Sequence, residues 1–396
     1  MKKLFILSIA IFSFCVTAQA QGINFFKGSL AEAKTEAKKQ NKLIFLDCFT
    51  TWCGPCNKMA RDIFPMKEVG DFYNANFVCF KLDMEKGEGI GVAKDYAVKG
   101  FPTYLYLNDA GETAHRTLGS TEAANFIENG KIAIDPNRNL KGLTARFKKG
   151  EKDPAMLKQL INLTGNVDQE LAENVLRVYW NSIGESKIAD KENWDVFKYN
   201  EKDINSSAYL YVSNHSDVFD AKYSKDEVDN AMFTIAAGAM GMAAKNKDEK
   251  LLVQAKGLLA NCNDKKILTM AGTNELGFYR RTDRWKEYIA VADKFLEKYG
   301  DKEYVYNSVA WEIFSHSDDQ AALEKGLGYA AQSMKMDKNY GNSDTYANLL
   351  WKLKRYKEAE TAAKESIELA KKEKLDYTST QELLDKVEKS LADTGK

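Results

Sequence analysis

The spacing of apolar positions divides the chain near residue 135. Before that point, continuous apolar runs of strand length alternate with stretches in which apolar residues recur at helical spacing. Continuous runs favour buried strands, and an Asn-Asp-Ala-Gly turn predicts that the fourth strand returns antiparallel to the third. The predicted strands are Lys42–Cys48, Phe77–Asp83, Tyr104–Leu107 and Glu112–Thr117.

Helical spacing predicts the elements around these strands, beginning with apolar positions at Leu30, Ala33 and Ala37. A proline after Phe64 is expected to end the second helix. The predicted helices are Ser29–Lys42, a helix after the Cys53–Cys56 segment that runs through Met59 to about Phe64, Glu68–Asn74, Gly91–Tyr96, and a last helix that Ser120 or Thr121 caps and that ends near Asn129 and Gly130. The order βαβαββα predicts an α/β fold whose parallel strands precede an antiparallel hairpin.

The segment Asp135–Asn139, which contains a proline and two asparagines, interrupts both patterns and marks the predicted domain boundary. Helical periodicity dominates from Leu140 onwards, and Ser207–Val212 is interpreted as a buried helix segment rather than a short strand. The predicted organisation is an α/β domain over residues 21–134, a linker at 135–140 and an all-α domain over 141–396.

A weak internal repeat lies in the last third of the chain. Arg284–Tyr288 and Arg355–Ala359 have similar sequences and lie about two tetratricopeptide periods of roughly 34 residues apart. From about residue 270 the all-α domain therefore weakly resembles a tetratricopeptide array, that is, a helical-repeat-like domain. An ordinary helical bundle whose aromatic residues form the core is the alternative interpretation.

Composition and charge narrow the function classes. The chain has 396 residues, more than one hydrophobic core usually organises. Its 57 Lys and Arg residues balance 57 Asp and Glu residues, so charge favours neither a nucleic-acid nor a membrane-surface partner. No segment after the first twenty residues is long and apolar enough to span a bilayer, and we expect no membrane span in the mature chain.

The first twenty residues resemble a secretory signal. Lys2 and Lys3 precede an apolar run, and Ala18-Gln19-Ala20 follows it as a small-residue cleavage site. Cleavage after Ala20 would begin the mature chain at Gln21, although an uncleaved anchor is the alternative. The predicted location is an exported compartment, and the bacterial periplasm fits it best.

The cysteines do not form a disulfide scaffold. Cys15 lies in the predicted signal, which leaves an odd and sparse set in a long chain. The cysteines that remain are Cys48, Cys53, Cys56, Cys79 and Cys262. Cys48 and Cys79 lie on adjacent predicted strands and could pair, but buried free thiols that act as small hydrophobes are favoured for both and for Cys262.

Cys53-Gly54-Pro55-Cys56 follows the first strand and begins the next helix. Two thiols at this spacing face each other, and unpaired N–H groups of the first helical turn favour a thiolate at the first cysteine. The same spacing is also half of a zinc site. A second C-x-x-C pair is absent from the sequence and the three histidines are scattered, so we predict no metal site and no cofactor.

With Trp52 in front of it, this motif resembles the active site of the thioredoxin family. Phe101-Pro102-Thr103 is similar to the cis-proline loop of that family, and Asp47 in the preceding strand matches its buried carboxylate. The resemblance implies a thioredoxin fold for the α/β domain. It also implies a redox disulfide between Cys53 and Cys56.

The resemblance further assigns roles to these residues. Cys53 would attack a disulfide, Cys56 would resolve the mixed disulfide, and Asp47 would take the proton of Cys56. Trp52, Phe101 and Pro102 would contact the substrate. An aspartate that only makes a hydrogen bond is the alternative for Asp47. In the family one lysine commonly follows the second cysteine and another faces the buried carboxylate, and here Asn57 and Cys79 are predicted to take those places.

The predicted function is an exported thiol–disulfide oxidoreductase that reduces or exchanges disulfides of client proteins, while its helical domain binds a client or partner. Its C-G-P-C motif resembles reducing members of the family, so a membrane reductant supplier is an expected partner. The alternative is a helical-repeat scaffold in which the thioredoxin domain is mainly structural.

Overall fold

The structure is a computed structural model that describes residues 22–165 and 167–394. The predicted signal at residues 1–20, with Cys15, lies outside the described residues. The chain divides into two compact units between Lys187 and Ile188, and each unit is described by itself. Among the described residues, no helix has the length and apolar character that a membrane crossing requires.

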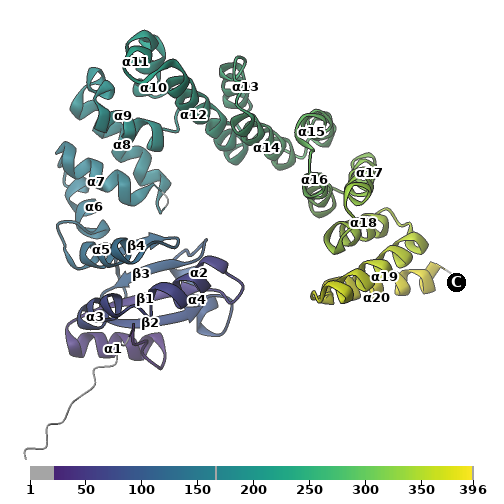
Figure 1. Cartoon of the computed structure of the whole chain (residues 1–396), viewed down its shortest axis with the longest axis horizontal. Coiled ribbons are helices and arrows are strands. Elements are labelled where there is room, and N and C mark those ends of the chain that lie inside the picture. The colour runs from purple at the N-terminus through teal and green to yellow at the C-terminus, as the bar shows by residue number, and fades with distance from the viewer. Residues whose placement is uncertain (1–21, 166, 395–396) are drawn as a thin grey trace, which may run out of the picture. The chain divides into compact units, whose positions relative to one another are not determined.

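The first unit is built on a four-stranded sheet (Figure 1). Its strands are β1 (Leu43–Phe49), β2 (Phe77–Asp83), β3 (Thr103–Leu107) and β4 (Thr113–Leu118), in the spatial order β2-β1-β3-β4. β1 pairs with β2 in parallel, and β3 runs antiparallel to both β1 and β4. The predicted α/β thioredoxin fold with its βαβαββα order is confirmed.

Helices cover both faces of this sheet because successive side chains of each strand point to opposite faces and both faces are apolar. On one face, Ile44, Leu46 and Cys48 of β1 pack against α1 and α4. On the other, Phe45 packs among aromatic side chains beneath α3 and α5. The helices of this domain are α1 (Leu30–Gln40), α2 (Gly54–Lys58), a π-helical segment (Met59–Ile63), α3 (Lys67–Asn76), α4 (Glu88–Asp95) and α5 (Ala123–Ile134).

The last of these helices differs from its prediction. Glu122 occupies the N-cap of α5 without a side-chain hydrogen bond, so the predicted cap at Ser120 or Thr121 is wrong. The helix also continues through Gly130 to Ile134. Gly130 does not end it because the missing side chain lets the helix approach the ring of Phe72, where a Cβ would stand 2.5 Å from a ring carbon.

Three further helices complete the first unit, and α6 contacts β4 at the sheet edge. Asn139 caps α6 and donates from Nδ2 to the carbonyl of Ala133 at 3.1 Å, while Lys141 Nζ contacts Glu112 Oε2 at 2.6 Å. These contacts attach α6 to the α/β domain. The helices are α6 (Leu140–Lys148), α7 (Pro154–Thr164) and α8 (Gln169–Ile183), followed by a 3-10 turn (Glu185–Ala189).

The described part of the second unit is helical. Ser207–Val212 lies within a helix, as predicted. The elements are α9 (Lys191–Asn200), α10 (Ser207–Asn214), α11 (Ser216–Tyr223), α12 (Lys225–Asn246), α13 (Glu249–Leu258), α14 (Lys265–Arg281), α15 (Trp285–Tyr299), α16 (Glu303–His316), α17 (Gln320–Met336), α18 (Tyr340–Lys352), α19 (Tyr356–Glu373) and α20 (Thr378–Thr394).

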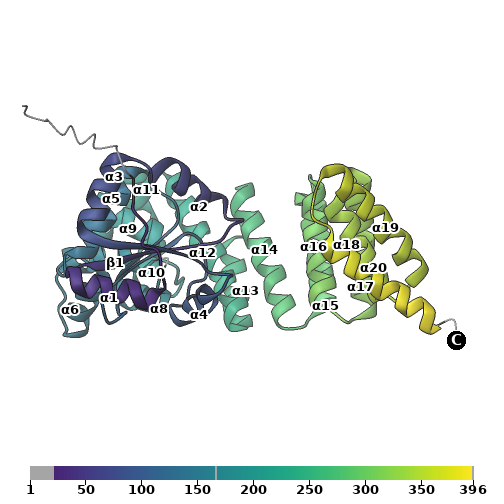
Figure 2. The same cartoon turned by 90° about the horizontal axis from the view of Figure 1, so that it is seen from below.

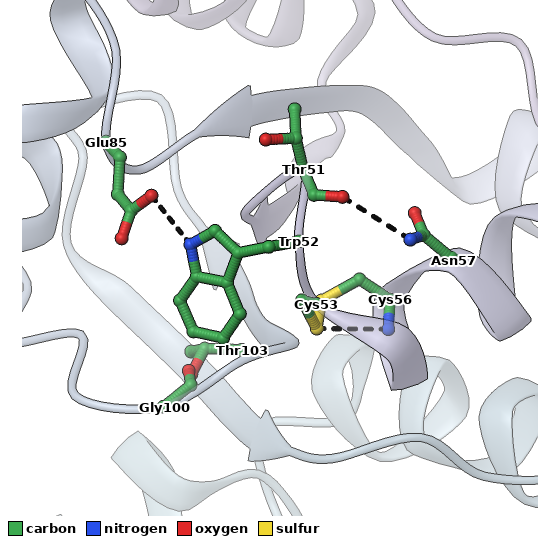
Figure 3. Close-up of a disulfide and its surroundings, with 8 residues drawn as sticks. All are labelled: Thr51, Trp52, Cys53, Cys56, Asn57, Glu85, Gly100 and Thr103. Carbon is green, nitrogen blue, oxygen red and sulfur yellow. Dashed lines mark hydrogen bonds between the residues drawn. A yellow bond between two sulfur atoms is a disulfide. The ribbon is translucent and has the colours of Figure 1, made fainter. Parts of the chain in front are cut away.

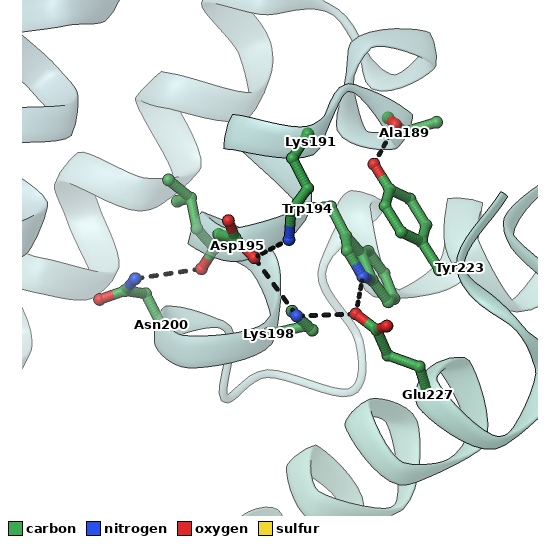
Figure 4. Close-up of polar contacts among 9 residues, drawn as sticks. Ala189, Lys191, Trp194, Asp195, Lys198, Asn200, Tyr223 and Glu227 are labelled. Atoms are coloured by element: carbon green, nitrogen blue, oxygen red, sulfur yellow. Dashed lines mark hydrogen bonds and ion pairs between the residues drawn. The ribbon is translucent and has the colours of Figure 1, made fainter.

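A network of polar contacts joins α9 to α12 (Figure 4). The indole Nε1 of Trp194 donates to Glu227 Oε1 at 2.9 Å, and Lys198 Nζ contacts the same oxygen at 2.7 Å. Lys198 also lies 3.3 Å from Asp195. One cation shared by two carboxylates fixes the two helices against each other.

From α14 onwards each helix contacts its neighbour in sequence, and α16 also contacts α18 (Figures 1 and 2). One hydrophobic cluster extends through these helices, from Leu276 to Val387. Such a succession is typical of stacked helical units, since each helix buries its apolar face mainly against sequence neighbours. The likeness to tetratricopeptide repeats stays a prediction.

Candidate active site

Cys53 and Cys56 form a disulfide at the beginning of α2, with an S–S distance of 2.03 Å (Figure 3). Cys53 is the N-cap of the helix, and its sulfur accepts a hydrogen bond from the backbone N–H of Cys56 at 3.1 Å. Both cysteines are nearly buried, with 3% and 5% of their surfaces exposed. The same N–H would favour a thiolate at Cys53 after reduction, since it points at the sulfur that would carry the charge.

The proline loop lies beside this turn. The Phe101–Pro102 peptide bond is cis, and the side chain of Thr103 donates to the carbonyl of Gly100 at 2.7 Å (Figure 3). The ring of Phe101 meets the indole of Trp52 edge to face, with centroids 6.0 Å apart. The structure therefore brings the predicted substrate-contacting residues together with the disulfide at one end of the sheet.

Trp52 is 66% exposed, which is unusual for so large an apolar ring. Its Nε1 donates to Glu85 Oε2 at 2.8 Å, and Glu85 follows β2 in the loop before α4 (Figure 3). The hydrogen bond holds the indole in place while its face remains open to solvent. The sequence reasoning missed Glu85, because nothing in the local pattern brings that loop to Trp52.

Asp47 lies in β1, six residues before Cys53, and is 5% exposed. Burial raises the pKa of its carboxyl to about 7, and the positive charge of Lys81 opposes this rise. The prediction that Cys79 faces Asp47 is wrong, because the parallel register of β1 and β2 pairs Asp47 with Lys81. Cys79 is opposite Phe45, two residues away.

A polar row crosses the sheet at the level of Asp47. Tyr104 of β3 pairs with Asp47 on one side and with Thr117 of β4 on the other. The hydroxyls of Tyr104 and Thr117 are buried and have no hydrogen-bond partner. Burial and the nearby Asp47 raise the pKa of Tyr104 well above its usual value. The sequence reasoning treated Tyr104 only as a strand residue, although a tyrosine inside a buried apolar run is a signal worth noting.

The next row of the sheet carries His115, which is fully buried in β4 opposite Tyr106. Neither ring nitrogen of His115 has a hydrogen-bond partner, and burial lowers its pKa to about 4. The imidazole therefore stays neutral at neutral pH. Nothing in the sequence pattern pointed to this environment.

The remaining cysteines that the structure describes, Cys48, Cys79 and Cys262, are free and buried. Cys48 packs on the face beneath α1 and α4, while Cys79 packs on the opposite face. The sheet lies between the two thiols, so they do not form a pair. Burial raises the pKa of Cys48 well above its usual value and that of Cys79 to about 12, and buried neutral thiols are poor nucleophiles.

Within residues 22–165 and 167–394, no group of three or more His, Cys, Asp or Glu side chains gathers as metal ligands would. The arrangement around Cys53 and Cys56 instead suits disulfide exchange: a polarised first sulfur, a second sulfur within bonding distance, and an apolar ring beside them.

Comparisons with known proteins agree with this geometry. Residues 30–131 match the family described as a thioredoxin-like domain. The chain is 31% identical over 87 residues to thioredoxin H4 of Arabidopsis thaliana, a match that covers 22% of this chain and 68% of the plant protein. It is also 31% identical over 93 residues to a thioredoxin-like protein of Synechocystis, covering 24% of this chain and 83% of that protein.

Among solved structures, a Bacteroides thetaiotaomicron protein described as a candidate disulphide isomerase is 42% identical to the matched part of this chain. The match covers 30% of this chain and 98% of that protein, with a TM-score of 0.28. Each of these matches covers less than a third of the chain.

Proposed function

The chain belongs to the thioredoxin family of thiol–disulfide oxidoreductases, and from this premise we propose that Cys53 and Cys56 reduce or exchange disulfides of exported client proteins. The observation that supports the proposal most directly is the Cys53 sulfur at the N-cap of α2, where it accepts the N–H of Cys56.

In the reducing direction, the Cys53 thiolate attacks one sulfur of a client disulfide and the other client sulfur leaves as a thiolate. The Cys56 thiol then loses its proton and attacks Cys53, which forms the Cys53–Cys56 disulfide and releases the first client sulfur. Two electrons pass to the client, which takes up two protons. In exchange, a second thiol of the client, rather than Cys56, attacks the mixed disulfide, which forms a new client disulfide and releases Cys53 as a thiolate without net transfer of electrons.

We propose that the carboxylate of Asp47 accepts the proton that the Cys56 thiol loses. A carboxyl whose pKa is about 7 exchanges protons readily at neutral pH, whereas an ordinary aspartate is almost fully ionised there. Trp52, Phe101 and Pro102 supply the surface against which an extended client segment lies. The exposed face of Trp52 gives that segment an apolar contact beside the disulfide.

An exported reductant must itself be reduced again, so we propose a membrane-embedded supplier of electrons as a partner and the periplasm as the location. The signal-like residues 1–20 support export. The helical domain would hold the client or another partner. Equilibration of the dithiol with glutathione tests the direction: a potential near −270 mV supports a reductase, and one near −120 mV supports an oxidant instead.

Reduction of insulin disulfides tests the activity itself. We expect Cys53→Ser to lower the rate by at least about 10³-fold, because the attacking sulfur is gone. Cys56→Ser should instead accumulate a mixed disulfide with the client, detectable as a mass shift. Equal rates for the wild type and Cys53→Ser would contradict the proposal and favour the scaffold alternative.

A further inference from the structure

A groove of about 610 Å³ lies within the second unit, between α14 and α16. Its floor is apolar: Leu276 of α14, Phe295 of α15 and Val309 of α16 are all nearly buried and line it. Tyr288 and Tyr299 of α15 complete this floor. The redox mechanism uses none of these residues.

Small side chains keep the groove open. Along α14, four of the lining residues form one stripe at intervals of four, with Lys265 at its end followed by the smaller Thr269, Thr273 and Gly277. Residues four apart lie on the same face of a helix, so the stripe forms a continuous wall without a large apolar side chain. A methyl group at Gly277 would have no heavy atom within 4 Å. From Lys265 to Arg280 the wall is roughly 22 Å long at 1.5 Å per residue.

The threonine and serine hydroxyls in the walls donate to carbonyls of their own helices, which leaves their oxygens to accept hydrogen bonds from an occupant. Thr269 donates to the carbonyl of Lys265 at 2.7 Å, and Thr273 donates to that of Thr269 at 2.9 Å. On α16, Ser308 donates to the carbonyl of Tyr304 at 2.7 Å. Each hydroxyl proton is therefore committed to its own helix, while the oxygen can still accept. An occupant that supplies N–H donors along its length suits these walls.

The charges at the two ends of the groove neutralise each other. Lys265 lies 3.0 Å from Asp301, and Arg280 lies 2.7 Å from Glu312. Neither cation is left to bind an anionic ligand without first breaking an ion pair. An uncharged occupant is favoured, because a charged one would lose hydration against an apolar floor.

We propose that this groove binds an extended, uncharged, apolar segment of a polypeptide chain, about six or seven residues long at roughly 3.3 Å per residue. Such a segment supplies backbone N–H groups along its whole length, buries apolar side chains on the floor, and brings no charge to the paired ends. The inference rests on the proposed function, since a disulfide client offers such segments while it is unfolded. Tyr304, which is 61% exposed at the rim, adds an aromatic contact.

Fluorescence anisotropy of a labelled, cysteine-free decapeptide of alternating leucine and serine tests the groove. The protein is the full chain carrying Cys53→Ser and Cys56→Ser, so that thiol exchange contributes nothing to binding. We expect Gly277→Arg to weaken binding at least about tenfold, because a charged side chain would fill the open wall. Thr273→Arg, on the same wall, should have the same effect and covers the case in which Gly277→Arg does not fold.

Gly328→Arg is the matched control. Gly328 is an exposed glycine of α17 outside the groove, and a side chain there would also meet no heavy atom within 4 Å. It should leave binding unchanged. Equal loss in the control, no binding of the peptide, or equally tight binding of a peptide with aspartate in place of leucine would overturn the proposal.

Glutathione disulfide reduction by the chain with both cysteines intact separates this inference from the proposed function. The groove variants should reduce this small substrate at the wild-type rate. Normal reduction without peptide binding would contradict the groove alone, whereas loss of reduction with normal peptide binding would contradict the redox function alone.

Discussion

The buried ionisable groups of the first unit and the paired carboxylates on the surface of the second unit are shifted in opposite ways. In the first unit, the sheet buries Asp47 and His115 away from water, and burial shifts the pKa of each toward its neutral form. In the second unit, hydrogen bonds from Lys198 and Arg355 lower the pKa of Glu227 and Glu358. Asp344, which is partly buried between α18 and α20 and has a raised pKa, is an exception there.

This difference bears on which ionisable groups can exchange protons near neutral pH. A buried group that titrates near neutral pH can exchange a proton during turnover, although its charged form weakens the fold. Ion pairs at the surface fix helices against each other and change little on titration near pH 7, and each adds little stability. The buried ionisable groups of the first unit therefore provide titratable sites at a cost in stability, whereas the paired carboxylates of the second unit add contacts between its helices.

The largest effect expected from this comparison is at Asp47. We expect Asp47→Asn to lower insulin reduction at pH 7 by about 10²-fold, because the proton acceptor for Cys56 is lost. Stopped-flow kinetics between pH 6 and 9 would measure it. Asp62→Asn is the control. Asp62 is an exposed carboxylate that forms an ion pair with Arg61, and its substitution should keep the wild-type rate. A rate within twofold of wild type for Asp47→Asn would contradict the role.

The same substitution should change how stability depends on pH. The pKa of Asp47 is about 7 in the folded protein and 3.8 as an ordinary aspartate in the unfolded chain, so its stabilising contribution is full below pH 3.8 and is lost as pH rises through 7. At pH 9 we expect the oxidised Asp47→Asn protein to gain on the order of 4 kcal/mol in urea unfolding relative to wild type. If the free energies of unfolding of Asp47→Asn and wild type differed by the same amount at pH 5 and at pH 9, the carboxyl of Asp47 would not be buried.

His115 should affect the free energy of unfolding at acid pH, whereas Asp47 affects it at neutral and alkaline pH. Its pKa of about 4 in the folded protein lies below the ordinary histidine value of 6.5, so the unfolded chain binds the proton first and stability falls as pH drops from 6.5 to 4. We expect His115→Leu to remove this loss, about 3 kcal/mol by pH 4. The exposed His215→Gln should keep the wild-type acid limb in the same unfolding series.

Removing the hydroxyl from each of two tyrosines on the same face of β3 should change the free energy of unfolding by different amounts. The hydroxyl of Tyr106 is hydrogen-bonded to that of Tyr73 at 2.9 Å, so Tyr106→Phe should cost about 1 kcal/mol. Tyr104→Phe removes a buried hydroxyl without a partner and should be neutral or slightly stabilising by thermal unfolding. A larger loss for Tyr104→Phe would mean that its hydroxyl has a partner in solution.

The smallest effect is expected in the second unit. Lys198→Met would break the contacts with Glu227 and Asp195 (Figure 4), and we expect a loss below about 1 kcal/mol, because the carboxylates are partly solvated. Calorimetry at low and high salt should give a smaller difference at high salt. Insulin reduction should not change. A lower rate would show that this network reaches the redox site.

Much of the first domain followed from local pattern alone. Continuous apolar runs predicted β1 and β2 to within a residue, because a strand buried on both faces leaves that signature. The end of α5 did not follow, since Gly130 is tolerated there through its close packing on Phe72. Glycine usually predicts a helix end, and only the approach of α3 reverses that expectation.

The candidate site divides in the same way. The sequence by itself determined the thiol pair, the proline loop and a carboxylate in the first strand, because short-range spacing and residue type define them. Only the tertiary structure decided that Lys81 and Tyr104, rather than Cys79, flank Asp47, since a shift of two residues in strand register changes every partner across a sheet. It also decided the groove, whose walls come from helices joined by the whole length of α15. Local periodicity reports which face of an element is apolar, but not which neighbour that face will meet.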